Sequence, residues 1–314
     1  MTETSTPDTS TLDSSARAVT TGTAKPAKPT RKVGSRRSGP ARILLPVGLA
    51  VAAIYFLFPV YWLVIAATKS TGSLFGSSGF VLSEPQLFQN LENVLTYNGG
   101  IYLRWGLNSI LYSGVGAIVA TILSMSAGYC LAKFVFRGRE FWFNVILAGV
   151  MIPGTALALP LFLMMSQLGL VNTYWAVLIP SMVSPFGVYL GRIYATAAVP
   201  DTLLEASRLD GAGEARIFFT LVLRLMTPAA VTVFLFQFIG IWNNYFLPLV
   251  MLSNPDLYPI TLGLVSWQSV SDRNPDLYQL AIGGAFMSVI PIMIAIVSLQ
   301  RFWKAGLTEG SVKG

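Results

Sequence analysis

Five stretches of the chain, each at least 24 residues long, contain no charged residue. They are residues 43–68, 105–132, 141–191, 225–255 and 277–300. A helix needs about 20 apolar residues to cross a hydrocarbon layer of about 30 Å. The longest run has 51 residues and is divided near its middle by residues 168–173, so it supplies two spans. The sequence therefore predicts six transmembrane helices.

The remaining composition excludes several kinds of chemistry. Only 11% of the 314 residues are charged, whereas soluble domains carry about 25%. The chain has no histidine and one cysteine, Cys130. An intrachain disulfide, a Cys/His zinc site and a Ser-His-Asp triad are therefore excluded, and we expect no metal site and no catalytic residue. The predicted fold class is an all-α membrane protein.

The basic residues orient the spans. With six spans and the N-terminus inside, the tail, residues 133–140, residues 192–224 and the C-terminal end carry 18 of the 21 Lys and Arg. Cytoplasmic loops are enriched in these residues. We therefore expect a multi-pass membrane protein with both termini in the cytoplasm. A nucleic-acid partner is not expected, because no folded basic module collects the charges.

The first 42 residues differ from the rest. They are rich in Ser, Thr, Ala and Pro and contain no apolar run, which predicts a disordered basic cytoplasmic tail before a six-helix transmembrane domain of residues 43–314. The basic half of the tail either contacts anionic lipid or serves as a solvated orientation signal. The first uncharged run has 26 residues, longer than the roughly 7 to 15 of a signal peptide, so we expect a retained span.

Two longer segments are expected outside. In residues 69–104, apolar residues recur at helical spacing over 87–95 after Ser83-Glu84-Pro85. This predicts an amphipathic helix that either lies at the outer surface or packs onto the bundle. Residues 253–276 carry Asp256, Tyr258 and Trp267, and this segment either contacts a partner or is a solvated connector.

Residues 192–224 form the only substantial charged stretch between spans. Pro200-Asp201 opens a predicted helix, Gly211 supplies a residue that accepts positive φ after its end, and a second helix is expected to start near Glu214. Small residues at the bend would allow another protein to approach closely. The residues alone leave two interpretations open, a docking knob and an amphipathic interfacial helix.

Several short motifs of this chain, taken in order, resemble those of one protein family. Glu205-Ala206-Ser207-Arg208-Leu209-Asp210-Gly211-Ala212 resembles the cytoplasmic loop motif (Glu-Ala-Ala, three residues, Gly) of membrane subunits of binding-protein-dependent ABC importers. Further similar motifs, in chain order, are Asn108-Ser109, Gly128-Tyr129, Phe136-Arg137-Gly138, Ile152-Pro153, Pro185-Phe186-Gly187 and Trp242-Asn243-Asn244. Over about residues 40–314 the chain resembles the smaller permease subunit of maltose-type carbohydrate importers. This resemblance implies a multi-pass protein of the bacterial cytoplasmic (inner) membrane.

The resemblance implies a division of labour. Residues of about 200–224 would form a coupling loop seated on an ATP-hydrolysing subunit, with the coupling residues Glu205, Ala206, Ser207, Arg208, Asp210, Gly211 and Ala212. The implied partners are a second homologous permease, two ABC ATPase subunits, an extracytoplasmic sugar-binding protein or lipoprotein, and membrane lipid. ATP and Mg would be used by the ATPase, and no cofactor is expected here. None of the seven lysines follows a glycine, so no G-x-x-x-x-G-K-[ST] phosphate loop is present.

The sequence departs from the family pattern at two positions. Ser207 replaces the usual second alanine, a change between small residues that preserves close approach. Arg224 stands where the family often has a proline, so we expect the helix there to be less interrupted. Prolines beside or inside spans, such as Pro153 and Pro228, are expected to kink them.

The implied activity is ATP-driven import of a carbohydrate, a di- or oligosaccharide, by alternating access. Uncharged polar residues are candidates for the substrate path. They are Ser184, Gln237, Trp242, Asn243 and Asn244. Trp242 either offers an aromatic face to a sugar or anchors the helix at the membrane interface.

Three alternatives remain. An ion-coupled carrier for a neutral polar solute is the main one, although the five runs contain no ionisable Asp, Glu, Lys, Arg or His. An enzyme is disfavoured because Glu205 and Asp210, five residues apart, face about 140° from each other on a helix. A structural or regulatory membrane protein is the third alternative.

Overall fold

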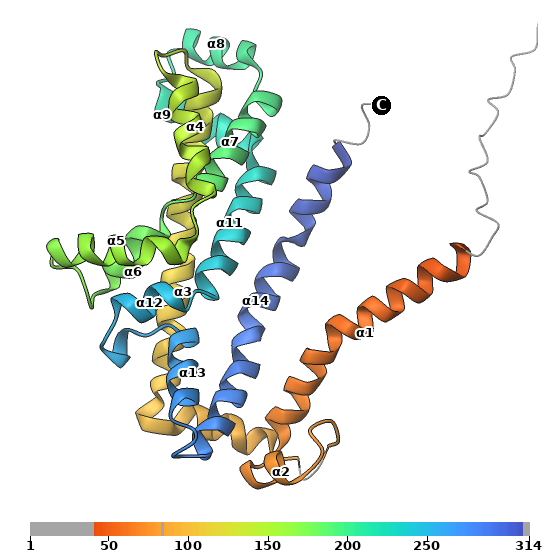
Figure 1. Cartoon of the computed structure of the whole chain (residues 1–314). Coiled ribbons are helices and arrows are strands. Elements are labelled where there is room, and N and C mark those ends of the chain that lie inside the picture. Colours follow the sequence, from red (N-terminus) through yellow and green to blue (C-terminus); the bar gives the residue numbers. More distant parts are fainter. Residues whose placement is uncertain (1–40, 83–84, 310–314) are drawn as a thin grey trace, which may run out of the picture. The chain divides into compact units, whose positions relative to one another are not determined.

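The structure, a computed structural model, describes residues 41–82 and 85–309, and helix is the only regular secondary structure in these residues (Figure 1). The α-helices are α1 (Ala41–Thr68), α2 (Thr71–Gly76), α3 (Leu87–Lys133), α4 (Arg139–Val150), α5 (Gly154–Gln167), α6 (Tyr174–Ser181), α7 (Pro185–Ala198), α8 (Asp201–Leu209), α9 (Glu214–Ile217), α10 (Leu223–Leu225), α11 (Thr227–Trp242), α12 (Phe246–Met251), α13 (Ile260–Ser269) and α14 (Asp276–Glu309). A π-helix (Phe218–Val222) joins α9 to α10, and a 3-10 helix (Pro255–Leu257) precedes α13.

The described residues fall into two units. The first ends at Ile54 and contains the first half of α1, and the second begins at Tyr55 and contains every site considered below. The predicted tail, residues 1–42, lies outside the described residues except for the last two, with which α1 begins.

Four helical stretches are long and apolar enough to cross a membrane as they stand. They are Leu44–Thr68, Leu87–Lys133, Tyr174–Ala198 and Asp276–Gln300. Two further pairs of helices qualify only together, and each pair is bent. The described chain thus holds four to six candidate spans, which confirms a multi-pass helical membrane protein.

The first bent pair lies in the run that begins at residue 141, where the sequence predicted a kink at a proline. Helices α4 and α5 meet at 106°. The break falls at Pro153, whose ψ of 130° is extended and whose nitrogen has no hydrogen to donate. The residue before a proline also disfavours helical geometry, so both sides of the break promote the turn.

The second bent pair corrects the expectation drawn from Arg224. The stretch Glu214–Leu225 meets α11 at 84°, so the chain is interrupted despite the missing proline. Met226, with ψ of 6°, ends one helix, and Pro228 lies in the first turn of the next. Proline in a first turn loses no helical hydrogen bond, which explains why the break falls two residues later than Arg224.

Helix α3 is interrupted near its start by a kink. Residues 97–100 are non-helical, with positive φ at Asn98, Gly99 and Gly100. The segment before this kink is the helix predicted from residues 87–95, and its Val94 is fully buried, so it packs onto the bundle. Trp267 of the predicted outer loop is likewise a core residue, in contact with Trp105 at a ring separation of 4.8 Å.

The close contact of α3 with α7 depends on glycine. A Cβ atom at Gly128 would lie 2.5 Å from the carbonyl carbon of Gly191 and 2.6 Å from the nitrogen of Arg192. Small residues of this kind allow helix backbones to approach in membranes, where no hydrophobic force drives helices together. This contact fixes the middle of α7 against α3, and α8 begins three residues after α7 ends.

Candidate functional site

Helix α8 is a short amphipathic helix that leaves the bundle after α7 (Figure 1). Pro200 is its N-cap, and Asp201 places a carboxylate in the first turn, where it complements the positive end of the helix dipole. Leu204 is its one fully buried residue and lies in a core cluster with Val199, Ile217 and Phe218. The apolar packing of α8 on the bundle therefore depends on the single side chain of Leu204.

The end of α8 is a Schellman motif. The N–H of Ala212 donates to the carbonyl of Ser207 at 3.0 Å, and the N–H of Gly211 donates to the carbonyl of Arg208 at 3.0 Å. Gly211 has φ of +80°, the conformation that this motif requires and that glycine adopts without strain. The predicted helix end and the predicted positive φ of Gly211 are confirmed, as is the start of the next helix at Glu214.

Two ion pairs hold α8 in place. Lys133, at the end of α3, donates from Nζ to Oδ1 of Asp201 at 2.8 Å, and its side chain is 9% exposed. Arg208 donates from Nε to Oε1 of Glu214 at 2.6 Å, and this bond raises the pKa of Arg208 above its ordinary value. The helix is thus fastened at both ends, by two residues, Lys133 and Glu214, that sequence reasoning did not single out.

Most of the predicted coupling residues share the exposed surface of α8 and its following turn. Glu205, Ala206, Arg208, Asp210 and Gly211 are exposed, and Ser207 and Ala212 are half-buried. Glu205 and Asp210 form no side-chain hydrogen bond or ion pair with another described residue. Leu209, which the motif does not specify, is 89% exposed. Leu209 and the carboxylates of Glu205 and Asp210 are thus accessible to a partner on this surface.

A cavity of about 460 Å³ lies where α5, α6, α11 and α12 meet. The cavity is lined by two of the predicted path residues, Gln237 and Asn244, and also by Ser181 and Thr155. Gln237 donates from Nε2 to the carbonyls of Ser181 at 3.1 Å and Val183 at 3.3 Å. Asn244 accepts from the N–H of Leu247 at 3.2 Å through Oδ1. The side-chain nitrogen of Asn244, Nδ2, makes no hydrogen bond to another described residue, so it can donate to a solute.

The other predicted path residues lie elsewhere. Ser184 is buried as the N-cap of α7, where its Oγ accepts from the N–H of Gly187 at 3.2 Å. Asn243 is exposed and donates to its own helix at Ile239. Trp242 is 2% exposed and stacks on Phe238 in the core. Neighbours therefore cover the indole within the described chain. The two interpretations of Trp242, as an aromatic face for a sugar and as an interfacial anchor, stay predictions.

Comparison with known proteins now identifies the family. Residues 120–305 match the model of the family described as "Binding-protein-dependent transport system inner membrane component". The chain belongs to this family. The matched region contains α8, its turn and the cavity around Gln237. The chain is therefore a multi-pass inner-membrane permease subunit of a binding-protein-dependent transport system, as the motif series predicted.

Individual relatives cover nearly the whole permease. The arabinooligosaccharides transport system permease protein AraQ of Halalkalibacterium halodurans is 36% identical over 273 residues, which are 86% of this chain and 96% of the relative. The lactose transport system permease protein LacG of Rhizobium radiobacter is 32% identical over 84% of this chain and 94% of the relative. A bacterial ABC transporter involved in the import of the acidic polysaccharide alginate has a chain of the same fold, with a TM-score of 0.72 and 23% identity over 83% of this chain and 96% of that one.

Proposed function

We propose that this permease works in an ATP-driven importer for a di- or oligosaccharide and that the exposed surface of α8 docks into an ATP-hydrolysing subunit. The observation that carries the proposal is the mounting of α8. Leu204 anchors it in the core, Lys133 and Glu214 fasten its two ends, and Leu209 is left exposed. A helix held in this way transmits force between a partner and the bundle.

The chemistry of the cavity supports a neutral polar solute. Its polar lining groups are the amides of Gln237 and Asn244 and the hydroxyls of Thr155 and Ser181, and no charged residue of the described part of the chain lines it. Uncharged donors and acceptors suit the hydroxyl groups of a saccharide. Arabinooligosaccharides and lactose, named for two relatives, belong to the same class. Family membership favours this function over an ion-coupled carrier.

The topology belongs to the proposal. Six crossings result if each bent pair of helices crosses once, and the basic residues then place both termini and α8 in the cytoplasm. Gln89 and Leu209, both exposed, provide a test in a variant without Cys130. A cysteine at position 89 should react with an impermeant maleimide on intact spheroplasts. A cysteine at position 209 should react only after lysis, and reaction of both from one side would contradict the topology.

The proposed assembly contains a second homologous permease, two ABC ATPases that use ATP and Mg, and an extracytoplasmic sugar-binding protein. One α8 can serve one ATPase, so a pair of ATPases requires a second coupling helix. Reconstitution with and without the second permease tests this stoichiometry. Sugar uptake by this chain with its ATPase and binding protein alone would refute the heterodimer, whereas uptake that requires the second permease would support it.

A further inference from the structure

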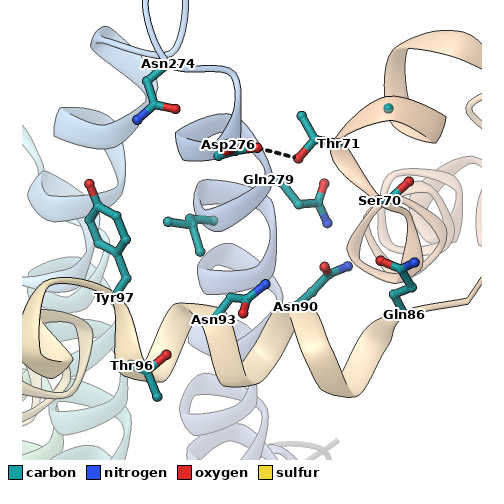
Figure 2. A pocket seen from close by; sticks show the side chains of 12 residues that line it. Ser70, Thr71, Gln86, Asn90, Asn93, Thr96, Tyr97, Asn274, Asp276 and Gln279 are labelled. Carbon is teal, nitrogen blue, oxygen red and sulfur yellow. Dashed lines mark hydrogen bonds between the residues drawn. The ribbon is translucent and has the colours of Figure 1, made fainter.

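A second and larger pocket lies at the opposite end of α3 from α8. Its volume is about 620 Å³, within the range of about 300 to 1,000 Å³ that is typical of small-molecule sites. It lies between α2, the first part of α3 and the start of α14 (Figure 2). The lining residues are almost all uncharged and polar, with Asp276 as the one charged member among them.

A buried amide in this pocket has an unused acceptor. Gln279 is 5% exposed, and its Nε2 donates to the carbonyl of Ala66 at 3.3 Å. Its Oε1 is buried and has no hydrogen-bond partner, alone among the buried side-chain polar atoms of the described residues. Figure 2 shows Gln279 reaching from α14 into the space between α14 and the segment of Ser70 and Thr71. Buried polar atoms in native proteins are normally bonded, so this oxygen needs a donor.

The remaining wall of the pocket is preorganised. Asn90 donates both amide hydrogens, to the carbonyls of Ala67 at 2.9 Å and Lys69 at 2.8 Å, which fixes the direction of its carbonyl oxygen. Asp276 accepts from the hydroxyl of Thr71 at 3.1 Å. Tyr97 lies at the kink of α3, edge-on to Trp267 at a ring separation of 5.5 Å, and remains accessible. Acceptors, amide and hydroxyl donors and an aromatic ring are thus held around one space.

This combination selects among ligand classes. An anion would be repelled by Asp276, and an ammonium group could not accept from the amides and hydroxyls. A hydroxyl group donates to Gln279 or Asp276 and accepts from an amide at the same time. The CH face of a sugar ring also suits an aromatic side chain such as Tyr97. A neutral polyhydroxylated ligand can therefore pair with the hydrogen-bond acceptors, the hydrogen-bond donors and the aromatic ring that line the pocket.

We propose that this pocket is a saccharide-binding site at the outer end of the permease, distinct from the cavity around Gln237. The inference rests on the proposed function for the class of solute and on the proposed topology for the side of the membrane. The ligand is a neutral sugar of one or two residues, or the end of a longer one, before it reaches the cavity. Gln279 supplies the buried acceptor, and Asn90, Asn93 and Asp276 supply the surrounding polar contacts.

Saturation-transfer NMR on the complete transporter in nanodiscs, without the binding protein, tests the site. The probes are lactose and arabinose at about 10 mM, which detects millimolar affinity, with cationic glucosamine and anionic gluconate for comparison. We expect a signal from a neutral sugar that falls at least threefold in Gln279→Leu. The exposed substitutions Asn93→Ala and Tyr97→Ala should lower it similarly without disturbing the fold. Gln268→Ala, an exposed amide on α13 outside the pocket, should retain the signal.

Three results would overturn the inference. They are no signal from either neutral sugar, a signal of equal size in all variants, and a preference for glucosamine or gluconate. Uptake of the sugar by the same preparations with the binding protein restored is measured in parallel. Normal uptake without binding to the pocket would refute this site alone, whereas absent uptake of every saccharide would refute the proposed function.

Discussion

The Nε of Arg208 donates to Oε1 of Glu214 at 2.6 Å and so joins the end of α8 to the first residue of α9. The second carboxylate oxygen, Oε2, accepts from the hydroxyl of Tyr129 on α3 at 3.5 Å. Glu214 therefore links the coupling turn to the bundle. Both partners of the ion pair are almost half exposed, so solvent screening limits its contribution to stability to about 1 kcal/mol or less. Its main effect is on the direction in which α8 points.

We expect Glu214→Ala to weaken coupling more than stability. The melting temperature of the purified complex should change little, because the lost ion pair is screened. Substrate-stimulated ATP hydrolysis should fall several-fold, because α8 loses one of its two fastenings. Arg104→Ala is the control, since it breaks a somewhat more exposed ion pair, with Asp256, that lies outside α8 and its turn. Equal loss of coupled hydrolysis in both variants would contradict a specific role for Glu214.

The turn after α8 gives a prediction with a paired control. Gly211→Val forces a β-branched residue into φ of +80°, at a cost of about 1 to 2 kcal/mol, and should reduce ATPase association and coupled transport. Gly213→Val adds the same side chain two residues later, where φ is −71° and the space is open. Pull-down of the ATPase should therefore be weaker for Gly211→Val than for Gly213→Val. Indistinguishable pull-down would show that the left-handed turn does not matter.

The bounds of α8 were predictable because they depend on neighbouring residues. Pro200, Asp201 and Gly211 act through local caps and turns, and the structure places the helix at Asp201–Leu209 as expected. The surroundings of Trp242 and Gln279 were not predictable. Trp242 is covered by a cluster that includes Trp105, and Gln279 bonds to Ala66, 213 residues away. Contacts between distant segments leave no periodic signal in one sequence.

The bends illustrate the same limit for backbone geometry. Pro153 and Pro228 identify where a helix is interrupted, but the angles of 106° and 84° depend on what each half packs against. Composition alone therefore predicts an apolar run and a break, and it cannot distinguish a kinked span from two separate helices.

The packing of α3 on α7 predicts that alanine substitutions at two glycines of α3, Gly128 and Gly114, change the stability of the protein to different extents. Gly128→Ala places a Cβ 2.5 Å from backbone atoms of Gly191, which cannot move away like a side chain, and should cost about 1 to 3 kcal/mol. Gly114→Ala has no neighbour within 4 Å and should be neutral or stabilising. Thermal unfolding of the two variants in the same detergent measures the difference. A melting temperature of Gly128→Ala at or above that of Gly114→Ala would argue against the close contact.

The cavity around Gln237 predicts a transport defect without a coupling defect. Gln237→Leu removes a polar side chain that lines the cavity. The loss of one hydrogen bond to the solute, worth about 0.5 to 1.5 kcal/mol, should lower sugar uptake by about 2- to 10-fold. ATPase association should be unchanged, because α8 is untouched. Asn243→Ala, which is exposed and outside the cavity, should transport normally. Loss of uptake only in Asn243→Ala would reverse the assignment of the path.

The central claim is that the exposed surface of α8 contacts an ATP-hydrolysing subunit, and photocrosslinking tests it most directly. A photoreactive phenylalanine analogue at Leu209, the most exposed apolar residue of α8, is compared with one at Phe88, which is 87% exposed on the first part of α3. In membranes that still import sugar, the account predicts an adduct with the ATPase from position 209 and none from position 88. An active complex in which position 209 gives no ATPase adduct would contradict it.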